Sequence, residues 1–329
     1  MNPLDATAPL TTPSNPLDAL LSRVPVVVLD GALATELERR GADLRDPLWS
    51  AEELIEAPGR IHDVHLDYFR AGADVASTAT YQATYEGFAR RGLDAVAASR
   101  LMHAAVAIAR AARDEFWADP AVRAGRERPL IAASIGPYGA MLGDGSEYRG
   151  GYGLDRSALR AFHRPRLATL ARGGADLLAF ETVPSLEEAL ALAELVGEWP
   201  GLTAWLSFAC RDGAHTAEGQ PVEAAAAALD THPQIVAIGV NCTAPRFVPE
   251  ILARMAAATR KPLIAYPNSG EQYDANAKCW HGAGTTDGAG FAHAAAGWHR
   301  AGARVIGGCC RTGPAEIRAI RAWADALPR

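Results

Sequence analysis

Eight apolar runs of strand length, separated by alanine-rich segments of helix length, constrain the fold of this chain more than any other feature. The runs cover residues 24–30, 73–80, 129–135, 175–181, 202–209, 235–242, 262–266 and 303–308. Continuous apolar runs are typical of parallel strands that are covered on both faces. Helices are expected between them at residues 93–116, 156–171, 186–196, 222–229 and 249–258. The pattern therefore predicts an α/β fold with a parallel sheet.

A (β/α)8 TIM barrel and a doubly wound sheet both fit this alternation, and the positions of the polar residues favour the barrel. Most of the strands end in costly or reactive groups, including Asp30, Glu181, Asn241, Cys242, Cys309 and Cys310. In a barrel all carboxyl ends of the strands meet at one rim, where such enzymes carry their active sites. We predict a single (β/α)8 barrel domain over residues 17–329, after a flexible tail over residues 1–16 that is rich in Pro, Thr and Asn.

Three of the five cysteines stand where strands are expected to end. Cys309 and Cys310 follow the last apolar run and the pair Gly307-Gly308, which allows the backbone to turn, and Cys242 ends the sixth run. A disulfide between neighbouring cysteines would be strained, whereas a turn can direct both thiols at one soft metal ion. Three thiolates with one open position are what a catalytic zinc site needs. A structural zinc site or a redox sensor remains an alternative reading.

Composition excludes several partner classes. The 329-residue chain is 49% hydrophobic and 21% charged, with a net charge of -6, so it can bury a large core and is a poor match for a polyanion such as nucleic acid. No uninterrupted apolar run approaches the roughly 18 residues of a membrane span, and the N-terminus lacks the pattern of a signal peptide. We expect a cytoplasmic protein with reduced thiols, no membrane or nucleic-acid partner, and a monomeric state.

Three separated motifs resemble the homocysteine S-methyltransferase family: residues 30–38 (DGALATELE), 239–242 (GVNC) and 307–310 (GGCC). Segments 134–139, 144–150, 162–166 and 266–273 resemble the branch that uses S-methylmethionine or S-adenosylmethionine as methyl donor. The resemblance implies a (β/α)8 barrel that transfers a methyl group to homocysteine, with zinc held by Cys242, Cys309 and Cys310. Binding the substrate thiol to zinc would keep it as the nucleophilic thiolate.

Four other residues at strand ends have expected roles, which the resemblance supports for Asp30 and Glu181. Asp30 and Glu181 are expected to bind the ammonium group of homocysteine, although a helix cap or an ion pair below the mouth would also explain them. Asn241 is expected either to donate a hydrogen bond to a ligating sulfur or to form a turn. The turn at Ser134 is expected to offer backbone N–H groups to the substrate carboxylate, although a turn at a strand end needs no ligand to explain it.

The prediction of the methyl donor depends on the loops at the barrel mouth and on leaving-group chemistry. Two loops, residues 137–153 and 267–290, are long enough to cover the mouth and carry aromatic residues that suit a sulfonium cation. A sulfonium releases a neutral thioether, which departs more readily than the amine of betaine, and the chain has no long extension after Cys310. The sequence has no Gly-x-Gly-x-x-Gly nucleotide fingerprint, which favours S-methylmethionine over S-adenosylmethionine. Betaine as donor and selenocysteine as acceptor are the enzymatic alternatives.

Overall fold

The computed structural model describes residues 15–42, 53–274, 279–281 and 288–328, and within them eight parallel strands form a barrel. The barrel strands are β1 (Val27–Val28), β2 (Val75–Ser77), β3 (Leu130–Ile135), β4 (Leu177–Val183), β5 (Ala204–Phe208), β6 (Ile235–Asn241), β7 (Leu263–Tyr266) and β10 (Ala303–Ile306). Each pairs with its neighbours in chain order, and β10 pairs with both β7 and β1. A parallel bridge between Leu29 and Val75 joins the first two strands. The predicted (β/α)8 barrel is confirmed.

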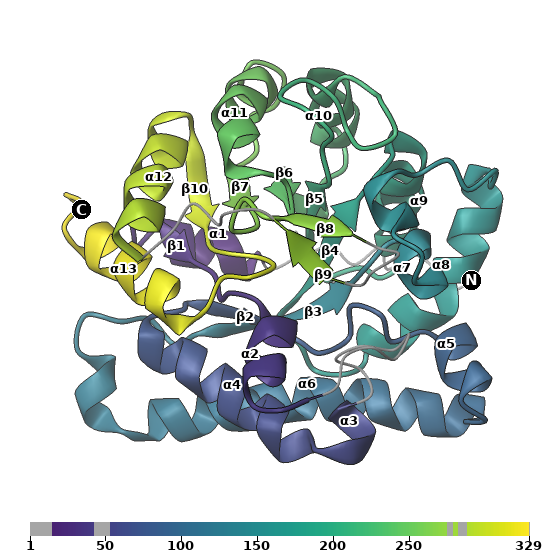
Figure 1. Ribbon diagram of the computed structural model, residues 1–329, viewed down its shortest axis with the longest axis horizontal. Helices are drawn as coiled ribbons and strands as arrows, with labels where there is room; N and C mark the ends of the chain where they lie inside the picture. Colours follow the sequence, from purple (N-terminus) through teal and green to yellow (C-terminus); the bar gives the residue numbers. More distant parts are fainter. Residues whose placement is uncertain (1–14, 43–52, 275–278, 282–287, 329) are drawn as a thin grey trace, which may run out of the picture.

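Helices surround the strands, as Figure 1 shows with the strands as the inner ring. The α-helices of the barrel units are α4 (Pro58–Ala71), α6 (Ala95–Ala118), α8 (Arg156–Leu170), α9 (Leu186–Val196), α10 (Val222–Asp230), α11 (Val248–Ala256), α12 (Gly288–Arg300) and α13 (Pro314–Asp325). Shorter helices are α1 (Pro16–Leu21), α2 (Leu33–Arg39), α3 (Glu53–Glu56), α5 (Tyr85–Arg90) and α7 (Tyr138–Leu142), with 3-10 turns η2 (Pro120–Arg123), η3 (Ser146–Tyr148) and η4 (Pro245–Phe247). An antiparallel hairpin, β8 (Gln272–Asp274) and β9 (Cys279–His281), follows β7.

The core has two layers because successive side chains of a strand point to opposite faces. Val28, Leu178 and Leu206 face outward and pack with the helices, whereas Val27 and Trp205 face the barrel interior. Leu17 and Leu20 of α1 belong to the inner cluster, so this short helix contributes to the interior packing of the barrel. Both faces of the sheet are therefore covered by apolar side chains, as continuous apolar runs predict.

The structure differs from the sequence expectations mainly at element ends. The strands β1, β2 and β10 are shorter than the apolar runs, because residues such as Asp30, Thr78 and Gly308 lie beyond the strand ends and line the mouth. The five predicted helices are present, within two residues at each end. Asn15 caps α1 and Pro16 is its first residue, so residues 15 and 16 of the expected tail belong to a capped helix. The rest of the expected tail, residues 1–14, lies outside the described residues.

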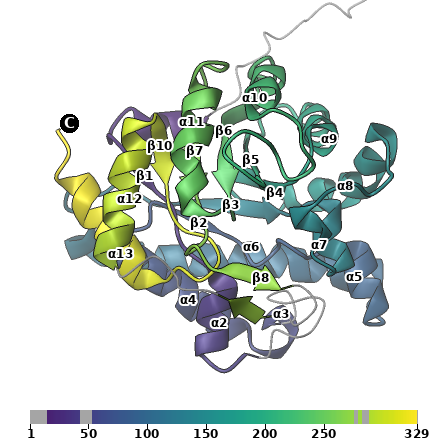
Figure 2. The same cartoon turned by 45° about the horizontal axis from the view of Figure 1, so that its top comes forward.

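In the part of the chain that the structure describes, one helix is long and apolar enough, by length and composition alone, to cross a membrane. It is α6, whose mostly small apolar residues are interrupted by few charges. Met102, Val106 and Phe116 on one side of α6 are buried in the outer core layer, and α6 packs along α4. Figures 1 and 2 both show these two helices side by side. This is the packing of a barrel helix.

Gly239 of β6 offers a test of the packing beneath the mouth. A methyl group at this position would overlap the backbone carbonyl of Ile264 on β7, so Gly239→Ala should lower the free energy of unfolding by at least about 2 kcal/mol. Gly59→Ala is the matched control, because Gly59 lies in α4 with open space around it and should gain about 0.5–1 kcal/mol. Urea unfolding of the two variants measures the difference, and equal stabilities would contradict the close approach.

Candidate active site

A pocket lies at the carboxyl ends of the barrel strands, where the predicted polar residues converge. The segments after β1 and β10 and the ends of β2, β3, β4, β6 and β7 all contribute to its wall. Its lining includes Asp30, Ser77, Tyr81, Gln82, Ser134, Glu147, Tyr148, Glu181, Thr182, Asn241, Cys242, Tyr266, Cys309 and Cys310. All seven residues proposed from the sequence thus line one cavity, although they come from five different segments of the chain.

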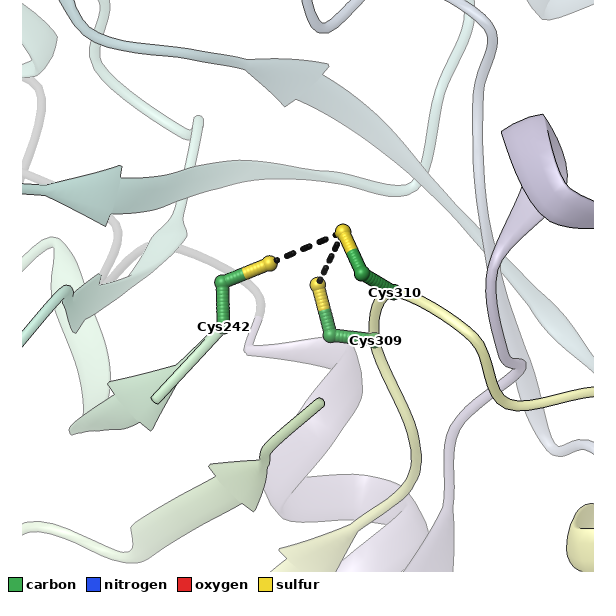
Figure 3. Close-up of side chains that lie close together, drawn as sticks. All are labelled: Cys242, Cys309 and Cys310. Atoms are coloured by element: carbon green, nitrogen blue, oxygen red, sulfur yellow. Dashed lines mark hydrogen bonds between the residues drawn. The ribbon is translucent and has the colours of Figure 1, made fainter. Parts of the chain in front are cut away.

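The three thiols meet as the strand assignment predicts. Cys242 follows the last residue of β6, and Cys309 and Cys310 lie on the loop after β10, with their sulfur atoms directed at one another (Figure 3). The Sγ atom of Cys310 is 3.3 Å from that of Cys242 and 4.0 Å from that of Cys309. All three sulfurs lie within 4.8 Å of one another. Hydrogen bonds from the two partner thiols lower the pKa of Cys242, so one thiolate is favoured in the metal-free cluster.

The cluster has the dimensions of a tetrahedral thiolate site. Three sulfurs around one zinc ion at about 2.3 Å would stand about 3.8 Å apart, and the observed separations span this value. Among the described residues no fourth protein ligand joins the group, and Cys210 lies outside it, so the three thiols that line the pocket are the residues that would hold the ion. Cys279 is in β9, and its side chain lies outside the described residues.

The loop that carries the vicinal pair is held by backbone contacts. The N–H of Gly308 donates to the carbonyl of Asp30 at 3.1 Å, and the N–H of Cys309 donates to that of Pro267 at 2.8 Å. A side chain at Gly308 would overlap Thr312, whose hydroxyl donates to the Cys309 carbonyl at 2.6 Å. The glycine therefore permits the tight turn that directs Cys309 and Cys310 to the same side.

Two predicted carboxyl groups lie near the thiols, both nearly fully buried. Asp30 accepts a hydrogen bond from the backbone N–H of Ser77 at 2.8 Å, and Glu181 accepts one from the hydroxyl of Ser134. Burial raises the pKa of Asp30 well above its usual range, and the nearby carboxylate of Glu181 raises it further. Burial likewise raises the pKa of Glu181 to about 7. A cation placed between them would reverse both effects.

Asn241 joins two strands beneath the cluster. Its side-chain oxygen accepts from the N–H of Thr182 at 2.6 Å and from the hydroxyl of Ser207 at 2.8 Å. Its amide nitrogen donates to Thr182 Oγ1 at 2.8 Å and lies 3.9 Å from the sulfur of Cys309. The side chain therefore links the ends of neighbouring strands and directs an N–H group at the Cys309 sulfur, and its role as a donor to a metal ligand stays a prediction.

Ser134 makes different contacts from those expected. Its backbone N–H donates to Thr78 Oγ1 at 3.2 Å, and the N–H of Gly136 donates to the Tyr81 carbonyl at 3.1 Å. These N–H groups of the turn already have protein acceptors, whereas the Ser134 hydroxyl contacts Glu181. The structure thus places Ser134 as a partner of a pocket carboxyl group.

Several pocket residues were not singled out individually by the sequence. Tyr148 comes from loop 137–153, and its hydroxyl lies 3.9 Å from the sulfur of Cys242. Tyr266 forms part of the floor, where its hydroxyl accepts from Trp205 Nε1 at 3.0 Å. The predicted lid is partly helical, since α7 and η3 lie within it. In the second loop, the side chains of Tyr273 and Trp280 lie outside the described residues, and His281 is exposed.

A buried charged network explains segment 162–166, which the sequence marked without a role. Arg166 donates to the carbonyl oxygens of Gly136 and Tyr81 at 2.5 and 3.3 Å. His163 lies between Arg166 and Glu188, at 2.9 and 2.8 Å. Because Tyr81 lines the pocket, this network holds one wall from behind.

Comparisons with known proteins agree with the site. The family model for homocysteine S-methyltransferase matches residues 27–324. Homocysteine S-methyltransferase YbgG of Bacillus subtilis (strain 168) is 52% identical, over 95% of this chain and 99% of that protein. Selenocysteine Se-methyltransferase of Brassica oleracea var. italica is 45% identical, over 89% of this chain and 87% of that protein. The metallated crystal structure of homocysteine methyltransferase MmuM from Escherichia coli superposes with a TM-score of 0.84, at 47% identity over 94% of this chain and 99% of that one.

The barrel and its thiol-lined mouth thus define a methyltransferase-type (β/α)8 enzyme. The chain belongs to the homocysteine S-methyltransferase family.

Proposed function

We propose that this protein is a zinc-dependent enzyme that transfers a methyl group from S-methylmethionine, or from S-adenosylmethionine, to the sulfur of homocysteine and so forms methionine. The observation that carries the proposal is the convergence of three thiols beside two buried carboxyl groups at the barrel mouth. The proposal also includes a cytoplasmic monomer with small-molecule partners.

Cys242, Cys309 and Cys310 would hold the metal, and their separations suit a tetrahedral ion. Zinc bound there would take the homocysteine sulfur in its open position and keep it as the thiolate, which is the form that attacks carbon. Asp30 and Glu181 line the same pocket and would bind the substrate ammonium, which offsets the cost of burying two carboxylates. Asn241 would orient Cys309 through its N–H group.

The remaining task of the protein is to bring two reactants into line. The walls formed by Tyr81, Tyr148 and Tyr266 narrow the pocket around the thiols and limit the access of water. Aromatic rings can also attract the positive sulfonium of a donor. Because the metal site and the carboxyl groups orient homocysteine from two ends, proximity would contribute several kcal/mol to the lowering of the barrier.

The alternative acceptor is selenocysteine, since a relative at 45% identity is named for that activity. Selenocysteine and homocysteine share the amino-acid end that Asp30 and Glu181 would bind, so the described contacts do not separate them. Parallel assays with the two acceptors distinguish the two candidate activities.

Zinc binding is the first prediction from this site. The protein should bind about one zinc ion. Cys309→Ser changes only one of the three ligands, so it should remove the metal and the activity while the fold remains. Cys210→Ser is the matched control, since Cys210 lies outside the cluster and should leave zinc content unchanged. Metal analysis and circular dichroism give the readouts, and folded, reduced protein that takes up no added zinc would overturn the proposal. Unfolding on chelation, rather than loss of activity alone, would instead indicate a structural site.

Glu181 generates the second prediction. If its carboxylate binds the ammonium of homocysteine, Glu181→Gln should raise the homocysteine KM about 10- to 150-fold, which corresponds to one charge-assisted hydrogen bond, and should leave zinc content intact. Glu187→Gln removes a carboxylate from the exposed face of α9 and serves as control. Steady-state kinetics at saturating donor measure the effect, and an unchanged homocysteine KM would assign Glu181 to a structural role.

The choice of donor is the third prediction and tests the proposed function as a whole. Methionine should form from homocysteine with S-methylmethionine and with S-adenosylmethionine, with the higher kcat/KM for S-methylmethionine, and not with betaine. The reason is that a neutral thioether leaves more readily than a tertiary amine. A higher kcat/KM for betaine would reverse the donor assignment, and no methionine with any donor would reject the activity itself.

A further inference from the structure

The charged side chains in the described lining of the pocket are all acidic. That lining contains the carboxyl groups of Asp30, Glu147 and Glu181 and the three thiols, and it contains no lysine, arginine or histidine side chain. A pocket of this charge attracts cationic groups. Two of its carboxyl groups have protein donors, because Ser77 donates to Asp30 and Ser134 donates to Glu181. The third, Glu147, has no role in the proposed function so far.

Glu147 is buried without satisfying its carboxyl group. Glu147 is only 4% exposed. Its Oε2 atom has no hydrogen-bond partner within the described part of the chain. A buried charged group that lacks a partner is costly, so such groups in folded proteins call for an explanation. The neighbouring Arg149 is exposed and donates to the carbonyl of Asp144 at 3.2 Å. A ligand that carries a positive charge would satisfy Oε2.

The turn that carries Glu147 is held firmly against the mouth. The Asp144 carboxylate accepts from the N–H of Ser146 at 2.9 Å, which fixes the start of η3, and η3 packs against α7 and β4. A methyl group at Gly139 of α7 would come within 2.5 Å of the Glu147 nitrogen, so the two backbones are in close contact. The next residue, Tyr148, reaches Cys242. Glu147 therefore lies on a fixed turn that also borders the thiols.

The cation that suits Glu147 follows from the two substrates of the proposed function. Homocysteine brings one ammonium, for which Asp30 and Glu181 are available. An amino-acid sulfonium donor brings a sulfonium and an ammonium. The sulfonium charge disappears as the methyl group leaves, so a carboxylate against it would stabilise the reactant more than the transition state and slow the transfer. The ammonium keeps its charge, so binding it assists without such a cost.

We propose that the Glu147 carboxylate binds the ammonium group of the methyl donor and thereby selects donors that carry an amino-acid end. This inference rests on the proposed methyl transfer and deepens it. Betaine has no ammonium N–H group to donate to the carboxylate, which gives a structural reason for its predicted exclusion.

Glu147→Gln tests the role with two donors that share the dimethylsulfonium group. S-methylmethionine carries the ammonium, and dimethylsulfoniopropionate lacks it. The variant should lower kcat/KM for S-methylmethionine by about tenfold or more, mainly through KM, because one charge-assisted hydrogen bond is lost. For dimethylsulfoniopropionate, kcat/KM, or the competitive inhibition constant where turnover is too slow, should change by less than about threefold. Glu147→Asp retains the charge and should recover part of the S-methylmethionine affinity.

Asp144→Asn is the matched control, because it removes an exposed negative charge from the same loop but keeps a side-chain oxygen that can accept from the Ser146 N–H, and it should leave both donors unaffected. Equal losses for both donors would overturn the inference, because Glu147 would then act on the sulfonium or through Tyr148. If Glu147→Gln raises the homocysteine KM as much as the S-methylmethionine KM, Glu147 binds the acceptor instead. If the KM for S-methylmethionine is unchanged, Glu147 does not contact the donor. Failure of the unaltered protein to make methionine with any donor is a separate result that rejects the proposed function.

Discussion

All eight barrel strands run in the same direction, and this places their carboxyl ends at a single rim. The ring is completed where the chain leaves β1: Leu29 bridges to Val75, the N–H of Asp30 donates to the Val75 carbonyl at 3.0 Å, and its carbonyl accepts from Gly308 at 3.1 Å. Asp30 therefore both completes the ring through its backbone and places its carboxyl group in the pocket. Closure of the barrel brings the start, the middle and the end of the chain together, and the thiol cluster depends on that closure because Cys242 and the vicinal pair are far apart in sequence.

A mouth of this composition is costly to form, since carboxyl groups and thiols are buried together. Hydrogen bonds from surrounding polar groups offset part of this cost. Ser134 donates to Glu181, and the side chain of Asn241 accepts from Thr182 and Ser207 below the cluster. Behind the wall, the side chains of His163, Arg166 and Glu188 form a hydrogen-bonded chain, and Arg166 also donates to two backbone carbonyls. The apolar interior beneath, centred on Trp205, needs no such support.

Backbone strain is concentrated at the same place. Within the described residues, three residues other than glycine have a positive φ: Thr182 at 59°, Cys242 at 45° and Arg311 at 68°. Thr182 and Cys242 line the pocket, and Arg311 directly follows Cys310. Such conformations cost on the order of 1–3 kcal/mol each and persist where surrounding contacts enforce them. Here they turn the chain sharply at strand ends, so that side chains point into the cavity rather than along the sheet. These conformations lower the stability of the fold, and they direct the thiols and the neighbouring side chains into the pocket.

The sequence by itself determined the barrel and the three thiols, because the alternation of apolar runs with alanine-rich segments and the cysteines at the ends of the sixth and eighth runs are local properties of the chain. It also identified Asp30 and Glu181, since an acidic residue at the end of an apolar run is rare enough to be noticed. Only the tertiary structure decided the partner of Ser134, the double role of Asn241 and the place of Glu147. Glu147 has nothing in its local sequence to separate it from Asp144, three residues earlier, which is exposed. The difference arises because η3 packs against α7 and β4, and whether a carboxyl group is buried or solvated depends on contacts between segments that no local pattern contains.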